Sequence, residues 1–270
     1  MSLIHIQNAC MTYGSPPRSI LHDIDLRIAE GEFCCLLGQT GCGKSTLLRL
    51  ILGAEQPSSG QILIDGQVHH RPDRTRGYVP QRYSLFPDKT VLDNITFGAE
   101  VGEFGPWGRF TPHFYRRRRL FREKAFDYLQ CIGLTEADAQ KYPDQLSGGM
   151  QQRVAIAQAL MTEPRILLMD EAFSALDPAT RREMQRLIRQ LWKDTGTTIL
   201  FVTHNTQEAL HLGTRIVVLA KESPEEGSRI ALDLPVPEEC REEDIPHLAR
   251  QLESVSHLGS AAEEVEQVGA

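Results

Sequence analysis

The hydrophobic and polar positions of this 270-residue chain follow two patterns. In the first third, apolar and polar residues alternate in short segments such as "LIHIQNACMTY", "ILHDIDLRI" and "ILIDGQVHH", with turn residues at Gly14, Glu30-Gly31 and Asp65-Gly66. Alternation of this kind predicts strands with one buried face. Later segments contain short continuous apolar runs, which are typical of central strands in a sheet covered on both faces. These runs are "FCCLL" (33–37), "RILLM" (165–169), "TILFV" (198–202) and "RIVVL" (215–219).

Helical patterns connect these runs. Residues 120–163 have a helical pattern that is interrupted at Gly133 and around Pro143. A further helix is predicted to begin at Pro178, after Asp177 as a cap, and to end near Asp194, because the fixed φ of proline suits the first helical position. We therefore expect an α/β body with a mainly parallel central sheet and an antiparallel β region at its N-terminal side.

A glycine-rich segment, "GQTGCGKS" (38–45), stands directly after the first apolar run and before the pattern "TLLRLILG". Glycines let successive backbone N–H groups point at one anion, and a helix start adds its dipole. Lys44 adds a mobile positive charge, and the Ser45 hydroxyl suits Mg2+. The segment therefore predicts a nucleoside triphosphate site. The residues assigned to it are Gly38, Gln39, Thr40, Gly41, Cys42, Gly43, Lys44, Ser45 and Thr46.

Cys42 lies among these aligned N–H groups and beside Lys44, an environment that lowers a thiol pKa. One hypothesis is that alkylation of Cys42 inhibits the protein and that nucleotide protects it. The alternative is an inert small residue that fills the loop.

An acidic pair, Asp170 and Glu171, follows the apolar run at 165–169. In open α/β sheets, ligands bind in the crevice at the carboxyl ends of the strands. Asp170 is therefore expected to bind Mg2+ directly or through water, and Glu171 to act as the base or to orient water for attack on the γ-phosphate. Nucleotide kinases and motor ATPases remain open at this point.

The segment "LSGGMQQR" (146–153) resembles the signature motif of ATP-binding cassette (ABC) ATPases, whose pattern covers residues from about 2 to 220. Further motifs of that family stand in the expected order: "MTYG" with Tyr13, "GYVPQR" with Gln81, "SALD" (174–177) and "FVTHN" with His204. The resemblance implies a P-loop NTPase fold with an inserted helical subdomain at about 90–163.

The same resemblance implies a role for each motif. Tyr13 stacks on adenine, Gln81 senses the γ-phosphate and the metal, and His204 bonds the γ-phosphate and positions Glu171. Ser45, Gln81 and Asp170 form the metal set. Ser147, Gly148 and Gly149 close on ATP held by a second copy, so that two cassettes enclose two ATP molecules. Asn205 departs from the family, which commonly has Asp after the histidine.

The charge of the chain is unevenly distributed. The net charge of -7 rules out a globally basic nucleic-acid binder, and we expect no nucleic acid partner. Residues 221–270 contain 13 acids and 4 bases, and are assigned to an acidic, Pro-containing tail after an ATPase domain at 1–220. An insertion at about 101–124 instead holds an Arg-rich cluster, with seven bases and one acid between Arg109 and Lys124.

The aromatic residues among these arginines, including Trp107 and Phe110, favour contact with an anionic membrane surface or a membrane subunit. The alternative is a solvated helix start with aromatic packing. No run of about 18 apolar residues is present, so a cassette of this kind needs separate permease subunits.

We therefore predict a peripheral protein at the cytoplasmic face of the inner membrane, with an extracytoplasmic solute-binding protein in the same system. The ending "THNTQEALHLGTRIVVLAKES" resembles the nitrate, sulfonate and taurine group of importer cassettes. The alternative function is a non-transport ABC ATPase in DNA repair, translation or cofactor assembly.

Overall fold

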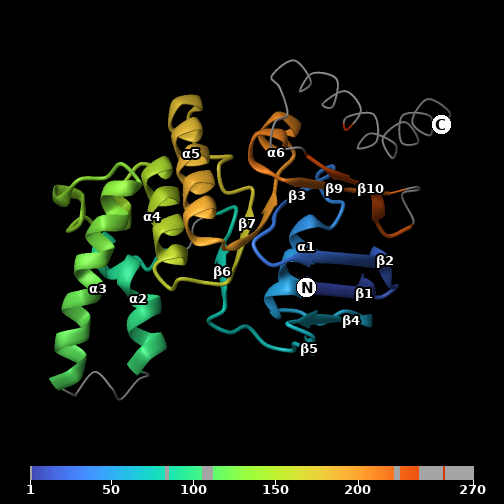
Figure 1. The fold of residues 1–270 in the computed structure, drawn as a ribbon, viewed down its shortest axis with the longest axis horizontal. Helices are drawn as coiled ribbons and strands as arrows, with labels where there is room; N and C mark the ends of the chain where they lie inside the picture. Colours follow the sequence, from blue (N-terminus) through green and yellow to red (C-terminus); the bar gives the residue numbers. More distant parts are fainter. Residues whose placement is uncertain (1, 83–84, 105–111, 222–225, 237–251, 253–270) are drawn as a thin grey trace. The chain divides into compact units, whose positions relative to one another are not determined.

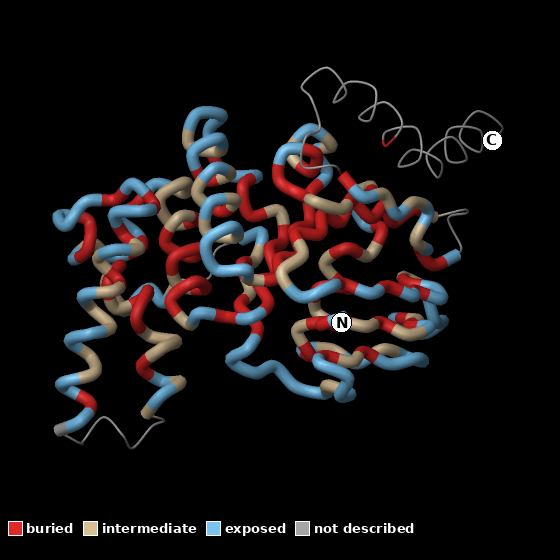
Figure 2. The backbone as a smooth tube through the Cα atoms, in the orientation of Figure 1, coloured by how far each residue is buried: buried red, intermediate tan, exposed pale blue. Residues whose placement is uncertain are grey.

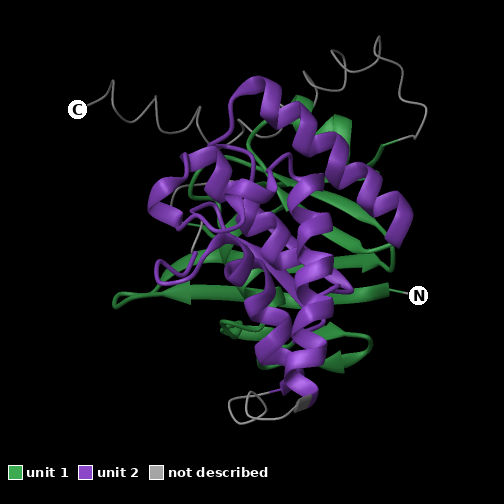
Figure 3. Cartoon of the chain, turned by 90° about the vertical axis from the view of Figure 1, so that its left-hand side faces the viewer, with its two compact units in different colours: residues 1–73, 196–270 green, residues 74–195 purple. Residues whose placement is uncertain are grey.

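The computed structural model describes all residues except 1, 83–84, 105–111, 222–225, 237–251 and 253–270. The chain divides into two compact units (Figure 3). The first comprises residues 1–73 and 196–270, and the second comprises residues 74–195. Each unit is described by itself.

The first unit contains an antiparallel sheet in the order β2-β1-β4-β5 (Figure 1). In β2, buried Ile24, Leu26 and Ile28 alternate with exposed neighbours, because successive side chains of a strand point to opposite faces. The predicted N-terminal β region is therefore confirmed. Its strands are β1 (Ser2–Tyr13), β2 (Arg18–Ala29), β4 (Ser59–Ile64) and β5 (Gln67–Val68).

A second set of strands in this unit has the order β10-β9-β3-β8. β3 pairs in parallel with both β8 and β9, whereas β10 pairs antiparallel with β9. Every residue of β3 and β8 is buried, which explains why all of them except Thr198 are apolar (Figure 2). The strands are β3 (Phe33–Leu37), β8 (Thr198–Val202), β9 (Arg215–Ala220) and β10 (Arg229–Pro235).

Two helices follow strands of this set. Helix α1 (Lys44–Leu52) follows β3 and ends at Gly53, which adopts the left-handed conformation. A side chain at Gly53 would approach the backbone of Arg71 to 2.8 Å, so glycine is required at this cap. Helix α6 (Thr206–Leu212) follows β8.

The second unit contains a parallel pair of strands, β6 (Arg76–Val79) and β7 (Ile166–Asp170), and a group of helices. Helix α5 begins at Pro178, as predicted, and ends at Thr195. Helices α2 and α3 pack against each other and against α4. These elements are α2 (Val91–Phe104), α3 (Pro112–Cys131), the short 3-10 helices η2 (Glu136–Asp138) and η3 (Pro143–Gln145), α4 (Gly148–Leu160) and α5 (Pro178–Thr195).

Strand β10 lies in the part of the chain that the sequence assigns to the acidic tail. It is held to β9 by an ion pair as well as by the backbone ladder: Arg215 donates to both carboxylate oxygens of Asp233, at 2.6 and 2.5 Å. The division of the chain at residue 220 stays a prediction. Within the described residues, none of the helices combines the length and apolar composition that crossing a bilayer requires.

Candidate functional site

The glycine-rich segment forms a tight loop between β3 and α1. The ammonium of Lys44, the first residue of α1, donates to the carbonyl oxygens of Gly38 and Gln39, both at 2.7 Å, and the side chain is 5 % exposed. Gly38, Gly41 and Gly43 all have positive φ, the region that glycine adopts without strain. The predicted strand, loop and helix start are therefore present at the predicted positions.

This loop fits a phosphate chain. A Cβ at Gly38 would lie 2.4 Å from the carbonyl oxygen of Leu219, so only glycine lets the backbone take this path. Gly43, the residue that precedes α1, has no side chain to cap the helix, and the N–H groups of the first turn are the donors that anions bind at helix starts. The loop, the helix start and Lys44 together suit a triphosphate.

Cys42 differs from the expectation for a reactive thiol. Its side chain is 4 % exposed, and burial raises its pKa even though Lys44 lowers it in part. The prediction of a lowered pKa is therefore wrong, because the loss of solvation outweighs the nearby positive charge. Cys42 instead packs inside the loop, where its sulfur would lie 2.6 Å from a Cβ at Gly38.

His204 follows β8, the strand that pairs with β3. Because Leu36 stands opposite Val202 in this parallel pair, the glycine-rich loop and His204 leave the sheet at the same edge. Asn205 accepts the backbone N–H of Glu208 at 3.1 Å and so caps α6. Asparagine and aspartate cap helices equally well, so the departure at this position retains the helix cap.

Tyr13 also belongs to the first unit. It is the last residue of β1, its side chain is 37 % exposed, and its hydroxyl donates to Glu55. Sequence reasoning assigned no role to Glu55, because a single acid after a helix carries no recognisable pattern.

In the second unit the structure brings Gln81, Asp170 and Glu171 to one edge of the β6–β7 pair. The Gln81 side-chain amide donates to the Glu171 carboxylate at 2.9 Å, and the Tyr78 hydroxyl donates to that of Asp170 at 3.4 Å. Asp170 ends β7 and is 5 % exposed, and Glu171 turns the chain with a φ of 46°. Tyr78 was not predicted from the sequence, because only the pairing of β6 with β7 brings it next to Asp170.

The signature segment forms the start of α4 in the same unit. Ser147 precedes the helix and accepts the backbone N–H of Met150 at 3.3 Å, and Gly148 and Gly149 form the first turn. Asp177 likewise precedes α5, where bonds from Thr180 lower its pKa. The helix start predicted at Pro178 is present, and the signature residues also stand at a helix start.

The Arg-rich cluster forms ion pairs with acids. From α3, Arg117 pairs with Glu103 of α2 at 2.7 Å, and Arg118 pairs with Glu100 at 3.1 Å. Further pairs join Arg118 and Arg122 to Asp93, Arg119 to Glu123, and Lys124 to Glu163. Phe114 packs edge-on against Phe104, with ring centroids 5.2 Å apart. Arg109, Trp107 and Phe110 lie outside the described residues.

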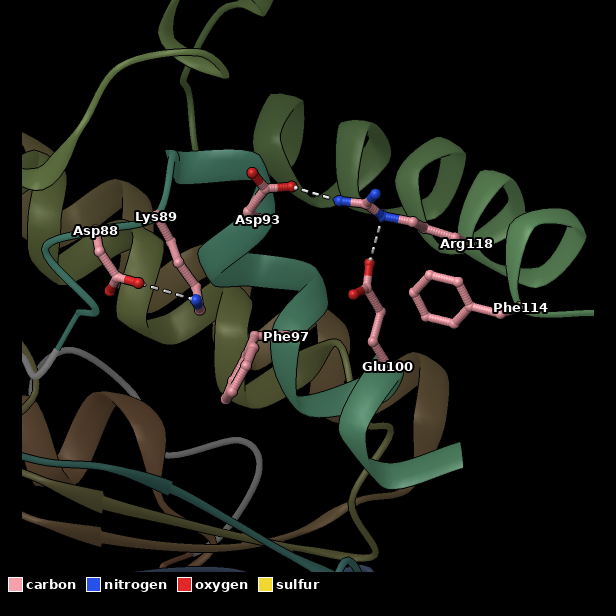
Figure 4. Close-up of a pocket in the computed structure, with 7 residues that line it drawn as sticks. All are labelled: Asp88, Lys89, Asp93, Phe97, Glu100, Phe114 and Arg118. Carbon is pink, nitrogen blue, oxygen red and sulfur yellow. Dashed lines mark hydrogen bonds and ion pairs between the residues drawn. The ribbon is translucent and has the colours of Figure 1, made fainter. Parts of the chain in front are cut away.

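A pocket of about 260 Å³ lies beside these ion pairs (Figure 4). Arg118 bridges Asp93 and Glu100 on one side, and Lys89 pairs with Asp88 on the other. The rings of Phe97 and Phe114 supply apolar walls. The pocket is therefore polar and charge-compensated, which suits a protein surface better than a small apolar ligand.

Comparisons with known proteins agree with this arrangement. A family model described as ABC transporter matches residues 21–174. The nitrate import ATP-binding protein NrtD of Synechococcus elongatus is 40 % identical over 80 % of this chain and 76 % of its own length. The sulfate/thiosulfate import ATP-binding protein CysA of Pectobacterium atrosepticum is 44 % identical, and the alignment covers 74 % of this chain and 59 % of that protein.

Solved structures of ABC cassettes are also similar to this chain. The dimeric structure of MJ0796, a bacterial ABC transporter cassette, matches with a TM-score of 0.73 at 31 % identity, over 87 % of this chain and 99 % of that chain. A strand, glycine-rich loop and helix start of this form define a P-loop nucleoside triphosphatase. The chain belongs to the ABC transporter family, whose ATP-binding subunits hydrolyse ATP coupled to transport.

Proposed function

We propose that this chain is the ATP-hydrolysing subunit of a membrane importer for a small oxyanion, with nitrate and sulfate as equal candidates. The observation that carries the proposal is the identity of 40 and 44 % to relatives named for nitrate import and for sulfate or thiosulfate import. These two identities are too close to decide between the anions. The sulfonate and taurine assignment stays a prediction.

In the first unit, the glycine-rich loop and Thr46 bind the phosphates of ATP, and Lys44 exchanges its bonds to the Gly38 and Gln39 carbonyls for phosphate oxygens. Tyr13 stacks on the adenine ring. His204 bonds the γ-phosphate. The position of His204 supports this role, because β8 places it at the same edge of the sheet as the glycine-rich loop that follows β3.

In the second unit, Glu171 orients or deprotonates the attacking water, and Gln81 senses the γ-phosphate. The bond from the Gln81 amide nitrogen holds the Glu171 carboxylate in one position, and an amide can bind a metal through its oxygen at the same time. Gln81 and Asp170 of this unit offer the oxygen ligands that Mg2+ prefers, and Ser45 of the first unit offers a hydroxyl of the same kind. The ion would neutralise charge on the phosphates.

The chain acts as a homodimer. A solved neighbour at 31 % identity is described as dimeric, and another as a dimer bound to ADP and Pi. Ser147, Gly148 and Gly149 start a helix whose first N–H groups suit a second phosphate group. Binding of ATP therefore favours the closed dimer, and loss of the γ-phosphate reopens it.

Permease subunits receive this movement, and the protein acts at the cytoplasmic face of the membrane beside an extracytoplasmic solute-binding protein. The polar pocket at α2 and α3 supports contact with a permease, because it lies between Gln81 and Ser147, the segment in which the resemblance to ABC cassettes implies docking of a membrane partner.

The catalytic assignment is tested with Glu171→Gln. This variant should bind ATP as tightly as the parent chain, hydrolyse it at least 100-fold more slowly, and elute as a dimer when loaded with ATP and Mg2+. Glu183→Gln, an exposed acid on α5, is the matched control and should hydrolyse ATP normally. Normal hydrolysis by Glu171→Gln would refute the role of Glu171.

Transport is tested by deleting the gene in its source organism and measuring uptake of labelled nitrate and sulfate. One uptake should be lost, and should return with the parent chain but not with Glu171→Gln. If neither uptake changes and the purified chain carries no permease, the non-transport alternative is supported and the importer is rejected.

A further inference from the structure

Four side chains of the first unit form a connected network between the end of β1 and helix α1. The Tyr13 hydroxyl donates to one carboxylate oxygen of Glu55, and Arg49 donates through Nε to the other at 2.6 Å. The Arg49 Nη2 atom lies 3.1 Å from the Thr46 hydroxyl and 3.5 Å from the Tyr13 hydroxyl. Glu55 therefore joins Tyr13 to Arg49, and Arg49 joins both to the first turn of α1.

The end of α1 places Glu55 beside Arg49. The backbone N–H groups of Ala54 and Glu55 both donate to the carbonyl oxygen of Arg49, at 3.0 and 3.3 Å. The left-handed cap at Gly53 makes this return possible. The carboxylate is thus fixed relative to α1 by backbone bonds as well as by its ion pair.

We propose that Glu55 and Arg49 are positioning residues that hold the Tyr13 ring in the orientation that stacks on adenine. This inference rests on the proposed role of Tyr13. The helix that carries Arg49 also begins at Lys44, so the same rigid element presents the phosphate loop and anchors the ring. The network therefore sets the position of the base platform relative to the triphosphate.

The physical reason is rotamer freedom. Tyr13 is the last residue of its strand, directly before the turn at Gly14, and more than a third of its side chain is exposed. An aromatic side chain in that position must be immobilised when a base stacks on it, and immobilising a side chain reduces affinity. Bonds from its hydroxyl to Glu55 and Arg49 restrict the ring before the nucleotide arrives. Removing them is expected to weaken ATP binding by about two- to tenfold.

The test compares binding of ATP with binding of tripolyphosphate, which has no base. Affinities are measured by calorimetry in EDTA, so that no hydrolysis occurs, for Tyr13→Phe, Glu55→Ala and the double variant. We expect each single variant to weaken ATP binding by about two- to tenfold, with tripolyphosphate binding unchanged. The double variant should bind ATP no more weakly than the single variant with the lower ATP affinity, because both changes remove the same Tyr13–Glu55 interaction.

Two further variants keep structural damage apart from loss of positioning. Glu55→Gln retains an oxygen acceptor for the Tyr13 hydroxyl and should recover most of the ATP affinity lost in Glu55→Ala. Asp25→Ala, an exposed acid on β2, is the control and should change neither affinity. An unchanged ATP affinity in Glu55→Ala, or equal weakening of ATP and tripolyphosphate binding, would overturn the inference.

Tyr13→Ala separates this inference from the proposed function. If Tyr13→Ala weakens ATP binding but not tripolyphosphate binding, while Glu55→Ala weakens neither, the stacking role stands and the positioning role is rejected. If Tyr13→Ala leaves the ATP affinity unchanged, the stacking role itself fails, and the positioning role fails with it.

Discussion

The glycine-rich loop contains two positions, Gly38 and Gly41, at which the same substitution to alanine should have effects of very different size. Gly38 and Gly41 both have positive φ, of 154° and 81°. A Cβ at Gly38 would lie 2.4 Å from the Leu219 carbonyl oxygen and 2.6 Å from the Cys42 sulfur. Apart from its neighbours in the chain, no heavy atom of the described residues lies within 4 Å of a Cβ placed at Gly41. Alanine at position 38 would therefore clash with its neighbours. Alanine at position 41 would only adopt a strained backbone conformation.

The magnitudes follow from these distances. A positive φ costs an alanine roughly 1 to 2 kcal/mol, which is the whole cost expected for Gly41→Ala. Gly38→Ala adds overpacking against the backbone of β9, which typically costs about 1 to 3 kcal/mol. The total cost of Gly38→Ala is therefore roughly 2 to 5 kcal/mol. The free energy of unfolding of an ordinary domain is only about 5 to 15 kcal/mol, so this cost is a large part of it. The loop can relieve this clash only by moving away from β9.

Two assays separate stability from binding. Chemical unfolding without nucleotide should show a lower free energy of unfolding for Gly38→Ala than for Gly41→Ala. Calorimetry should show ATP affinity reduced at least 100-fold in Gly38→Ala, because the carbonyls and N–H groups of the loop are displaced together, and at most about tenfold in Gly41→Ala. If Gly38→Ala binds ATP and unfolds like the parent chain, the inferred packing of the loop on β9 is wrong.

Several carboxylates and thiols outside the glycine-rich loop should also respond to substitution or labelling in ways that their surroundings determine. Bonds from Lys141 and Thr135 hold the pKa of Asp138 far below its usual range, so the stability it contributes is present above pH 4 and is lost as pH falls. Asp138→Asn should lower the free energy of unfolding in urea by about 1 kcal/mol at pH 7, with the difference shrinking below pH 4; a pH-independent difference would contradict this. Iodoacetamide at pH 8 should label exposed Cys131 before buried Cys42, whose pKa is raised, and equal rates by peptide mass spectrometry would refute it. Asp233→Ala should cost about 1 kcal/mol because half-buried Arg215 loses a bidentate partner, whereas Glu123→Ala should cost less than about 0.5 kcal/mol; equal urea midpoints would count against the difference.

Strands that are buried on both faces were predictable from sequence. The runs at 33–37 and 198–202 have the bounds of β3 and β8, because burial on both sides favours apolar residues; the one polar residue, Thr198, accepts the backbone N–H of Gly31. The start of α5 was predictable as well, since Asp177 and Pro178 satisfy the two requirements of a helix start in adjacent positions. These features depend on residues close together in the chain.

Features that depend on distant residues were not predictable. Strand β10 has the alternating pattern "RIALDLP", but it stands in a segment rich in Glu and Pro, and its stability comes from β9 and from the Arg215–Asp233 pair. The sequence places Lys44 beside Cys42 but does not reveal how deeply the thiol is buried, and burial decides the direction of its pKa shift. The Tyr13–Glu55 bond joins residues 42 positions apart.

The Arg-rich cluster shows why counting charge along a sequence overstates the charge of a surface. Because α2 and α3 form a helical hairpin, Arg117, Arg118 and Arg122 meet Glu103, Glu100 and Asp93 in reverse order along the two helices. Glu100 is 6 % exposed, so removing Arg118 would leave an uncompensated buried charge within the hairpin.

Attraction to anionic lipid is worth about 1 kcal/mol for each Lys or Arg near a membrane surface, and a residue already paired with an acid contributes less. Among the described arginines of the cluster, Arg116 is exposed and has no acidic partner within the described part of the chain. The four arginines at 116–119 therefore carry much less outward charge than their number suggests. We therefore expect the proposed contact with a permease to depend more on the shape and polarity of the pocket at α2 and α3 than on a basic patch.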